Sequence, residues 1–389
     1  MKRFLSLLCA VALVAALFSG CIPSMNLPEE IPATPVVDDR PHLGTDLTVY
    51  PLYDTLSEDD KLIWDNICTA IENHSTEWIH IGTYTGVAEA GNAEKRIGYI
   101  FRELSYACPD YFWLNLYDYT IHTTETETDT TIELEVKYIL DQETAQSYKE
   151  AYDAKVNEIV AAAKEIPELF DRVLYVYDTI MAGAEYDTQL AEMDETDHVN
   201  LSAYGCLVAG KTVCSGYALA FRSIMDKLDI ECGVEFNSYQ FYSGWLVGHV
   251  WNYCKLDGEY YYFDLTWDDT SLESGPSHFF FAITRDDLSK SSYYLYENSP
   301  VPLCTGTKYN YFRYQGLNFE KYDYNAIKSV LQAHRNEESV TLRFDTQAER
   351  DRAEKALIED QAIFDMLPEL RSIRWVSPET DLHLVLVLK

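Results

Sequence analysis

The sequence predicts an α+β protein in which a central domain lies between two smaller α+β modules. Hydrophobic residues make up 47% of the 389 residues, which is enough for substantial folded cores. Segments of helical and strand periodicity alternate along the chain after residue 46. The order helix, strand, helix, two strands occurs near both ends of this region. We therefore expect flanking modules at residues 47–142 and 305–389 and a central domain at residues 143–304.

The first 21 residues have the composition of an export signal. Lys2 and Arg3 precede an apolar stretch at residues 4–17, which is too short to span a bilayer comfortably. Small residues then lead into Cys21, and the segment resembles a bacterial lipobox. This resemblance implies that Cys21 is diacylated and becomes the mature N-terminus. The alternative is an ordinary secretory signal that is cleaved nearby.

The next segment extends this expectation. Residues 22–46 contain several prolines among polar and acidic residues, which predicts an extended tether. Two or three acyl chains hold a protein at a membrane far better than one chain does. We therefore expect a lipid anchor in the membrane, with the folded part outside the cytoplasmic membrane at the cell surface.

Charge and cysteine content exclude some kinds of partner. The formal net charge of −34 repels phosphate backbones, so we expect no nucleic-acid partner and a neutral or basic substrate. Seven of the nine cysteines remain once Cys9 and Cys21 are assigned to the signal and to lipid. This odd number indicates a reactive thiol or the absence of a disulfide framework. The cysteines show no CxxC pair or zinc-binding spacing, which argues against metal binding by these thiols. The sequence leaves the oligomeric state open.

Each flanking module is predicted to contain a helix, a strand, a second helix and two further strands. In the N-terminal module these are a helix capped by Ser57, a strand at 78–81, a helix at 93–105, and strands at 111–116 and 131–139 beside a Thr/Glu-rich turn. In the C-terminal module they are predicted at 326–334, 339–344, 347–360, 373–376 and 382–388. The shared order favours the hypothesis that the two modules are related. The alternative is a chance match, because this order of elements is common.

The central domain is predicted to begin with helices at residues 144–166 and 168–181 and an acidic loop at 187–197. A loop-like segment containing two glycines follows at residues 204–213. Beyond this segment, apolar residues recur at helical spacing, starting from Cys214.

Cys214 is therefore expected at the N-terminus of a buried helix. The exposed N–H groups and the helix dipole stabilise a thiolate there, and they lower the pKa of the sulfur. The backbone N–H of the cysteine can also donate to a developing oxyanion. We expect the small residues Ser215 and Gly216 to let a substrate backbone approach.

A base and a carboxylate are expected on the hairpin that follows. Strands at residues 248–256 and 259–267 are joined by Asp257-Gly258, a strong signal for a two-residue turn. His249 lies eight residues before the turn and Asp264 six residues after it. In the paired strands Asp264 is therefore about two residues away from the position opposite His249, and the two side chains can meet across this diagonal. A hydrogen bond between them would fix the tautomer and orientation of the imidazole.

Three ordered motifs in residues 204–269 resemble those of the transglutaminase-like superfamily. They run from Val213 to Ala218, from His249 to Asn252 and from Asp264 to Asp269. The resemblance, which extends over residues 150–290, implies a papain-like α+β core whose cysteine-bearing helix packs on an antiparallel sheet. It also implies that Cys214, His249 and Asp264 are catalytic and perform thiol acyl transfer on a protein or peptide amide. Thiol acyl transfer needs neither a metal nor an organic cofactor, so we expect no metal and no cofactor.

Several alternatives stay open at the level of sequence. The acyl-enzyme can pass to an amine, or to water as in a peptidase or amidase acting on peptide or cell-wall amides. A non-catalytic surface binding module could keep the same fold, although the complete Cys/His/Asp set argues against it. Asp268 or Asp269 could orient the imidazole in place of Asp264. Packing roles are predicted for Cys206, Tyr217, Trp267 and His278.

Overall fold

The computed structural model describes residues 56–85, 106–192, 198–240, 246–270, 276–291, 301–376 and 382–388, together with Tyr53, Tyr293, Tyr294 and several positions within 95–104. The predicted signal, the tether and Cys21 lie outside these residues. Among the helices that the structure describes, none combines the length and the apolar character needed to cross a membrane.

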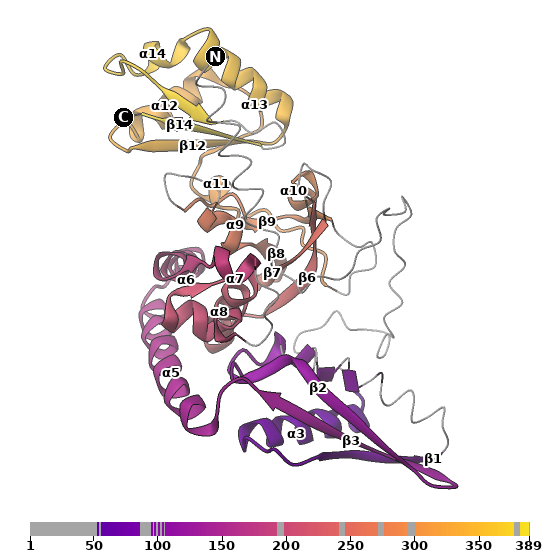
Figure 1. Ribbon diagram of the computed structural model, residues 1–389. Helices are drawn as coiled ribbons and strands as arrows, with labels where there is room; N and C mark the ends of the chain where they lie inside the picture. Colours follow the sequence, from indigo (N-terminus) through magenta and orange to yellow (C-terminus); the bar gives the residue numbers. More distant parts are fainter. Residues whose placement is uncertain are drawn as a thin grey trace.

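Three sheets follow one another along the long axis of the molecule (Figure 1). A three-stranded sheet lies at one end, a five-stranded sheet in the middle and a four-stranded sheet at the other end. Helix α5 (Gln142–Lys164) runs along the side from the first sheet to the middle of the molecule. Helices accompany every large sheet, and nearly all strand pairs are antiparallel, so the predicted α+β class is confirmed.

The N-terminal module contains α3 (Glu58–Glu72), β1 (Ile79–Thr85), β2 (Leu114–Glu125) and β3 (Asp129–Tyr138). The Ser57 hydroxyl accepts a hydrogen bond from the N–H of Asp60, which confirms the predicted cap. The described positions between residues 95 and 107 are helical, as expected.

One prediction in this module was wrong. The Thr/Glu-rich segment is mostly strand, because β2 continues to Glu125 and β3 starts at Asp129. Threonine is β-branched and favours strands, and its hydroxyl can bond across the sheet. Thr83 and Thr131 show this contact, with their hydroxyl oxygens 3.1 Å apart.

The C-terminal module repeats the topology of the first. It contains α12 (Tyr324–Ala333), β12 (Ser339–Phe344), α13 (Gln347–Glu354), β13 (Arg374–Val376) and β14 (His383–Val387). In both sheets the last strand of the module lies between the other two: β3 between β1 and β2, and β14 between β12 and β13. All four of these pairings are antiparallel. The likeness of the two modules therefore extends from element order to sheet order.

The C-terminal module also differs from prediction in detail. The helix predicted at 347–360 is divided into α13 and a π-helical segment, Lys355–Glu359, and a further short helix, α14 (Ala362–Met366), follows. A short strand, β11 (Asn318–Phe319), adds a parallel edge next to β12.

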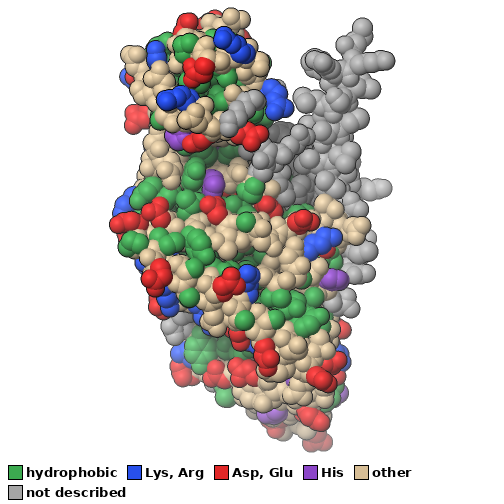
Figure 2. All heavy atoms as spheres, turned by 90° about the vertical axis from the view of Figure 1, so that its left-hand side faces the viewer, with side chains coloured by type: hydrophobic (Ala, Val, Ile, Leu, Met, Phe, Trp, Pro, Cys, Tyr) green, Lys and Arg blue, Asp and Glu red, His purple; other side chains and the backbone are tan. Residues whose placement is uncertain are grey.

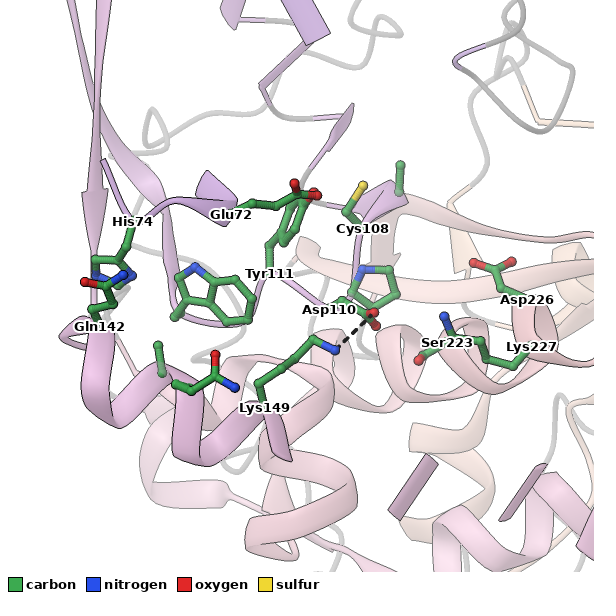
Figure 3. Close-up of a pocket in the computed structure, with 15 residues that line it drawn as sticks. Glu72, His74, Cys108, Asp110, Tyr111, Gln142, Lys149, Ser223, Asp226 and Lys227 are labelled. Carbon is green, nitrogen blue, oxygen red and sulfur yellow. Dashed lines mark hydrogen bonds and ion pairs between the residues drawn. The ribbon is translucent and has the colours of Figure 1, made fainter. Parts of the chain in front are cut away.

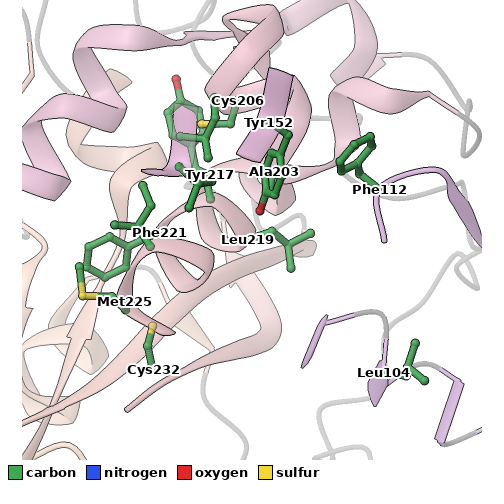
Figure 4. Packing of buried hydrophobic residues seen from close by; sticks show 14 of the residues in the cluster. Leu104, Phe112, Tyr152, Ala203, Cys206, Tyr217, Leu219, Phe221, Met225 and Cys232 are labelled. Atoms are coloured by element: carbon green, nitrogen blue, oxygen red, sulfur yellow. The ribbon is translucent and has the colours of Figure 1, made fainter. Parts of the chain in front are cut away.

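In the central domain, one helix packs on an antiparallel sheet. The helix is α8 (Cys214–Lys227), and the sheet has the order β10-β6-β7-β8-β9. The bounds of its strands are β6 (Cys232–Gln240), β7 (Leu246–Leu256), β8 (Glu259–Phe263), β9 (Phe281–Ile283) and β10 (Tyr293–Tyr294). Figure 4 shows Phe221 and Met225 of α8 beside Cys232 of β6 in the buried layer between them.

Other helices surround α8. On its outer side lie α5 and α6 (Leu169–Gly183), close to the predicted helices. The acidic loop predicted at 187–197 begins instead with a short helix, α7 (Thr188–Glu192). The segment predicted as a loop at 204–213 contains a π-helix, Gly205–Ala209.

After that π-helix, β5 (Lys211–Thr212) pairs in parallel with β4 (Glu185–Tyr186). The strand predicted at 259–267 ends early, at Phe263, and α9 (Leu265–Thr270) follows it. The Asp264 carboxylate accepts a hydrogen bond from the N–H of Trp267 at 3.1 Å, the geometry of a helix N-cap. This cap explains why the chain turns into a helix there.

Candidate active site

Cys214 is the first residue of α8, as predicted. The residue before it, Val213, has extended backbone, and the N–H groups of the first helical turn follow immediately. The cysteine is only 2% exposed and packs with Ala218 and Val250. Its thiol therefore lies at the positive end of the helix dipole in apolar surroundings, where water is scarce.

The two small residues after Cys214 have a packing role that the sequence did not predict. A Cβ on Gly216 would lie 1.8 Å from the Thr212 hydroxyl and 2.7 Å from the carbonyl oxygen of Ser202. The Ser215 hydroxyl donates to the carbonyl of Leu201 at 2.7 Å. Both residues thus hold the start of α8 against the preceding segment, and their expected role in admitting a substrate backbone stays a prediction.

His249 and Asp264 are joined as the hairpin count predicted. Their Nε2 and Oδ2 atoms are 2.6 Å apart, and the two residues are 6% and 2% exposed. The β7–β8 register pairs Asn252 with Phe263, so Asp264 comes at the end of β8 on the diagonal from His249. Both carboxylate oxygens of Asp264 are therefore held by hydrogen bonds: Oδ2 by the His249 imidazole and Oδ1 by the N–H of Trp267 at the start of α9.

Aromatic rings surround the imidazole of His249. The Trp251 ring centroid lies 5.7 Å from that of His249, and the Trp267 ring approaches edge-on at 6.1 Å. These indoles shield the His249–Asp264 hydrogen bond from water, which strengthens it electrostatically. Trp267, for which core packing was predicted, is therefore also part of the wall of the site.

Helix α8 lies along β7 in a defined alignment. Cys214 meets Val250, the residue after His249. One turn later, the carbonyl of Ala218 accepts a hydrogen bond from Asn252 Nδ2 at 3.0 Å. The cysteine end of the helix is thus placed at the level of His249 in the strand.

Asn252 is a site-positioning residue that the sequence motif contained without revealing its role. It is fully buried, and its Nδ2 also donates to the carbonyl of Gly233 at 3.2 Å. One amide therefore ties α8, β6 and β7 together. The available signal was a polar amide between Trp251 and Tyr253 in a strand whose neighbouring side chains are aromatic or apolar.

The two alternative carboxylates are bonded elsewhere. Asp268 accepts hydrogen bonds from Tyr177 at 2.6 Å and Ser277 at 2.8 Å, and burial raises its pKa to about 7. Asp269 accepts from Tyr217 at 2.5 Å, and burial raises its pKa as well. Of the three carboxylates, Asp264 is the one that contacts His249.

Other singled-out residues have packing roles. Cys206 is buried behind α8, and burial raises the pKa of its thiol (Figure 4). His278 pairs with Asp178 at 2.7 Å and stacks on Tyr311, with ring centroids 4.1 Å apart. Tyr217 is buried and held by its bond to Asp269.

A large crevice with polar and apolar lining residues lies away from these residues. It has a volume of about 550 Å³ and is lined by α5, the N-terminal module and the C-terminal end of α8 (Figure 3). Lys149 and Asp110 form an ion pair across it, and Ser223 and Lys227 mark its position on α8. Cys214 is at the opposite end of this 14-residue helix. At a rise of about 1.5 Å per residue, Ser223 lies roughly 14 Å along the helix from Cys214, and the cysteine does not line the crevice.

The surface charge and potential ligand groups add two further observations. Acidic side chains are spread over all parts of the face seen in Figure 2, consistent with the net charge of −34. Within the described segments, His, Cys, Asp and Glu side chains do not gather in threes as a metal-binding group.

No protein-family model matches the chain, and no curated protein matches its sequence. Part of the chain is similar to a solved structure described as a "Putative Cysteine Protease" from Cytophaga hutchinsonii. The two sequences are 14% identical, the similarity covers 39% of this chain and 65% of that chain, and the TM-score is 0.25. Part of the chain is also similar to a solved structure described as a TGase, at 12% sequence identity and a TM-score of 0.26. This similarity covers 40% of this chain and 46% of that chain.

The chain thus spans less than two thirds of either of these proteins. At such identities and scores, the fold assignment depends on the topology of the chain itself. That topology places a cysteine at the start of a helix, the helix on an antiparallel sheet, and a histidine–aspartate pair on the adjoining hairpin. The central domain therefore has the α+β arrangement, a cysteine-bearing helix packed on an antiparallel sheet, that the motif resemblance predicts.

Proposed function

We propose that the protein is a cysteine enzyme that cleaves an amide of a protein or peptide through an acyl-enzyme on Cys214. Two observations carry this proposal: the buried His249–Asp264 hydrogen bond, and the packing of Cys214, at the start of its helix, against Val250, the residue that follows His249. A thiol, a base and an orienting carboxylate are the groups that covalent amide chemistry needs.

The proposed mechanism starts with proton transfer. With Nε2 turned to Asp264, the ring nitrogen that accepts the Cys214 proton is Nδ1. The thiolate attacks the amide carbonyl and forms a tetrahedral oxyanion, to which the N–H groups at the start of α8 can donate. As the C–N bond breaks, the imidazolium returns its proton to the departing amine.

The acyl group then leaves Cys214 by a second attack. An amine acceptor gives a new amide, which is transfer or crosslinking, and water gives a carboxylate, which is hydrolysis. In either case His249 takes the proton of the attacking group and returns it to the sulfur. The amine outcome is our proposal, following the motif resemblance, and hydrolysis of peptide or cell-wall amides is the alternative.

We further propose that the enzyme works at the cell surface, held there by acyl chains on Cys21. This part of the proposal is supported by the charge, length and small-residue end of residues 1–21. Growth with a labelled fatty acid tests it directly. Label should be incorporated into the wild-type chain and absent from Cys21→Ser, and a labelled Cys21→Ser protein would contradict the assignment.

The central experiment combines a peptide library with an isotopically labelled primary amine and mass spectrometry. Amine incorporation into peptides supports acyl transfer, and release of peptide carboxylates without incorporation supports hydrolysis. Cys214→Ser and His249→Ala are the matched controls, and each should abolish both products. Absence of both products with the wild-type protein, together with a Cys214 that iodoacetamide alkylates no faster than free cysteine, would favour a binding module instead.

A further inference from the structure

The immediate surroundings of Cys214 are apolar and come from two parts of the chain. Ala218 and Val250 are buried against the cysteine, and Val234 and Tyr106 pack on this group while partly exposed. Three of these four residues belong to the central domain. Tyr106 comes from the helical segment of the N-terminal module.

A second aromatic side chain lies beside this group. Phe236 pairs with Val250 across β6 and β7, so it is the cross-strand neighbour of a residue that touches the cysteine. Val234 is two residues earlier on β6, and strand alternation therefore places Val234 and Phe236 on the same face of the sheet. Yet Phe236 is 45% exposed, one of few large hydrophobic side chains among the described residues that remain so accessible.

An exposed phenylalanine next to a nucleophile has a physical consequence. Burying apolar surface is favourable by roughly 25 cal/mol per Å², so an apolar group bound here gains free energy that a polar group does not. Tyr106, Val234 and Phe236 are themselves uncharged, so the surface that these three side chains present is apolar apart from the tyrosine hydroxyl. Its chemistry selects a hydrophobic ligand.

We infer that Tyr106 and Phe236 form an apolar specificity subsite beside Cys214. The subsite would receive the aromatic or large aliphatic side chain that flanks the attacked amide. The N-terminal module thereby takes part in substrate selection, because it supplies one of the two aromatic residues. This inference depends on the proposed function, since it names the substrate class of the same thiol.

Two alkylating probes that differ in one ring test the inference. Iodoacetamide is small, and N-benzyl-iodoacetamide presents a phenyl ring beside the same reactive carbon. The rate at Cys214 is measured for each by peptide mass spectrometry and divided by the rate of the same probe with glutathione. We expect the wild-type protein to favour the benzyl probe by about tenfold, the factor that corresponds to roughly 1.4 kcal/mol of apolar burial.

The variants separate the possible causes. Phe236→Ala and Tyr106→Ala should each bring the ratio of the two normalised rates close to one, whereas Tyr106→Phe should keep it. Trp375→Ala removes a comparably exposed aromatic residue from the C-terminal module and should leave the ratio unchanged. Because Phe236 is on the surface, its truncation should leave folding intact, which a thermal melt verifies.

Each remaining outcome has a defined meaning. If the normalised rates of the two probes with the wild-type protein are nearly equal, the inferred subsite is wrong. If Tyr106→Ala accelerates both probes equally, Tyr106 is a cover over the thiol rather than a subsite wall, and the inference also fails. The proposed function stands or falls separately, on whether iodoacetamide alkylates Cys214 faster than free cysteine and loses this advantage in His249→Ala.

Discussion

At the residue scale, Asp264 links the proposed catalytic histidine to local folding. One of its oxygens contacts His249 Nε2 and the other accepts the Trp267 N–H that caps α9. The second contact fixes the carboxylate so that the first can orient the imidazole. A change at Asp264 therefore has to be designed so that it removes one contact at a time.

Asp264→Asn achieves this separation. The remaining amide oxygen can keep the helix cap, but the amide NH₂ facing Nε2 would favour the wrong histidine tautomer. We expect kcat/KM for amide cleavage to fall by about 10²- to 10⁴-fold, with a melting temperature close to that of the wild type. Steady-state kinetics and calorimetry on the same preparation measure both. Near-normal activity would mean that Asp264 serves only as the cap.

A second residue-scale prediction concerns the buried Asp268. Burial raises its pKa from 3.8 to about 7, although His278 and the bonds from Tyr177 and Ser277 oppose the shift. Between these values the folded state binds more protons than the unfolded chain, so stability falls as pH rises through this range. The shift corresponds to roughly 4 kcal/mol as an upper order of magnitude.

Thermal melts from pH 4 to pH 8 measure this effect. The wild-type melting temperature should decrease as pH rises towards 7, and Asp268→Asn, which carries no titrating proton, should flatten the curve. Asp171→Asn removes a charge from an exposed position on α6 and serves as the control. Parallel curves for wild type and Asp268→Asn would contradict the assigned protonation.

At the element scale, the start of α8 is set by close packing of three segments. Gly216 leaves no room for a Cβ beside Thr212 and the Ser202 carbonyl. Gly216→Ala should lower the free energy of unfolding by about 1–3 kcal/mol through overpacking. Thr212→Ala should recover part of that loss in the double variant. Denaturant unfolding of the wild type, the two single variants and the double variant gives the coupling free energy between the two positions. If the two single effects simply add in the double variant, the strain does not arise between Gly216 and Thr212.

Local patterns predicted the elements that build the site. The start of α8 at Cys214, the turn after β7 and the diagonal between His249 and Asp264 follow from residue spacing alone. The early end of β8 was missed because the Asp264 cap competes with strand propensity, and a capping aspartate is ambiguous when it follows a strand. The π-helix at Gly205–Ala209 has no periodic signature that could reveal it.

Contacts between distant segments were beyond the sequence. Asn252 reaches the Ala218 carbonyl across 34 positions of the chain, and Tyr106 packs on the cysteine group from another module. Spacing rules describe neighbours within one helix or one hairpin, so they are silent about such pairs. The similar sheet orders of the two modules also became visible only in three dimensions.

At the scale of the whole molecule, the two flanking modules are attached in different ways. The N-terminal module shares one continuous hydrophobic core with the central domain. Within this core the ring centroids of Phe112 and Tyr152 of α5 are 5.3 Å apart. The C-terminal module has a separate core, which includes Phe279 of the central domain stacked on His383. We therefore expect the N-terminal module to unfold together with the central domain.

The C-terminal module is joined by a buried ion pair that can be broken selectively. Arg343 of β12 has a side chain that is 4% exposed and pairs at 2.5 Å with Asp287 of α10 (Arg285–Lys290). Burial alone would raise the pKa of Asp287, but the Arg343 charge and the bonds from Thr284 hold it below the usual 3.8. The stabilisation is thus present above about pH 4 and is lost as pH falls through the pKa of the folded state.

Arg343→Ala should leave Asp287 buried without this partner, at a cost of about 3–5 kcal/mol to the junction. We expect calorimetry to resolve a separate, lower transition for the C-terminal module, and limited proteolysis to cleave between residues 305 and 323. Arg352→Ala removes an exposed arginine whose pair with Glu349 should contribute about 1 kcal/mol or less, so it is the matched control. Because the proposed catalytic residues belong to the other cooperative unit, Cys214 alkylation should be unaffected by either variant. A single transition in Arg343→Ala would show that the hydrophobic contacts around Phe279 suffice to join the two units.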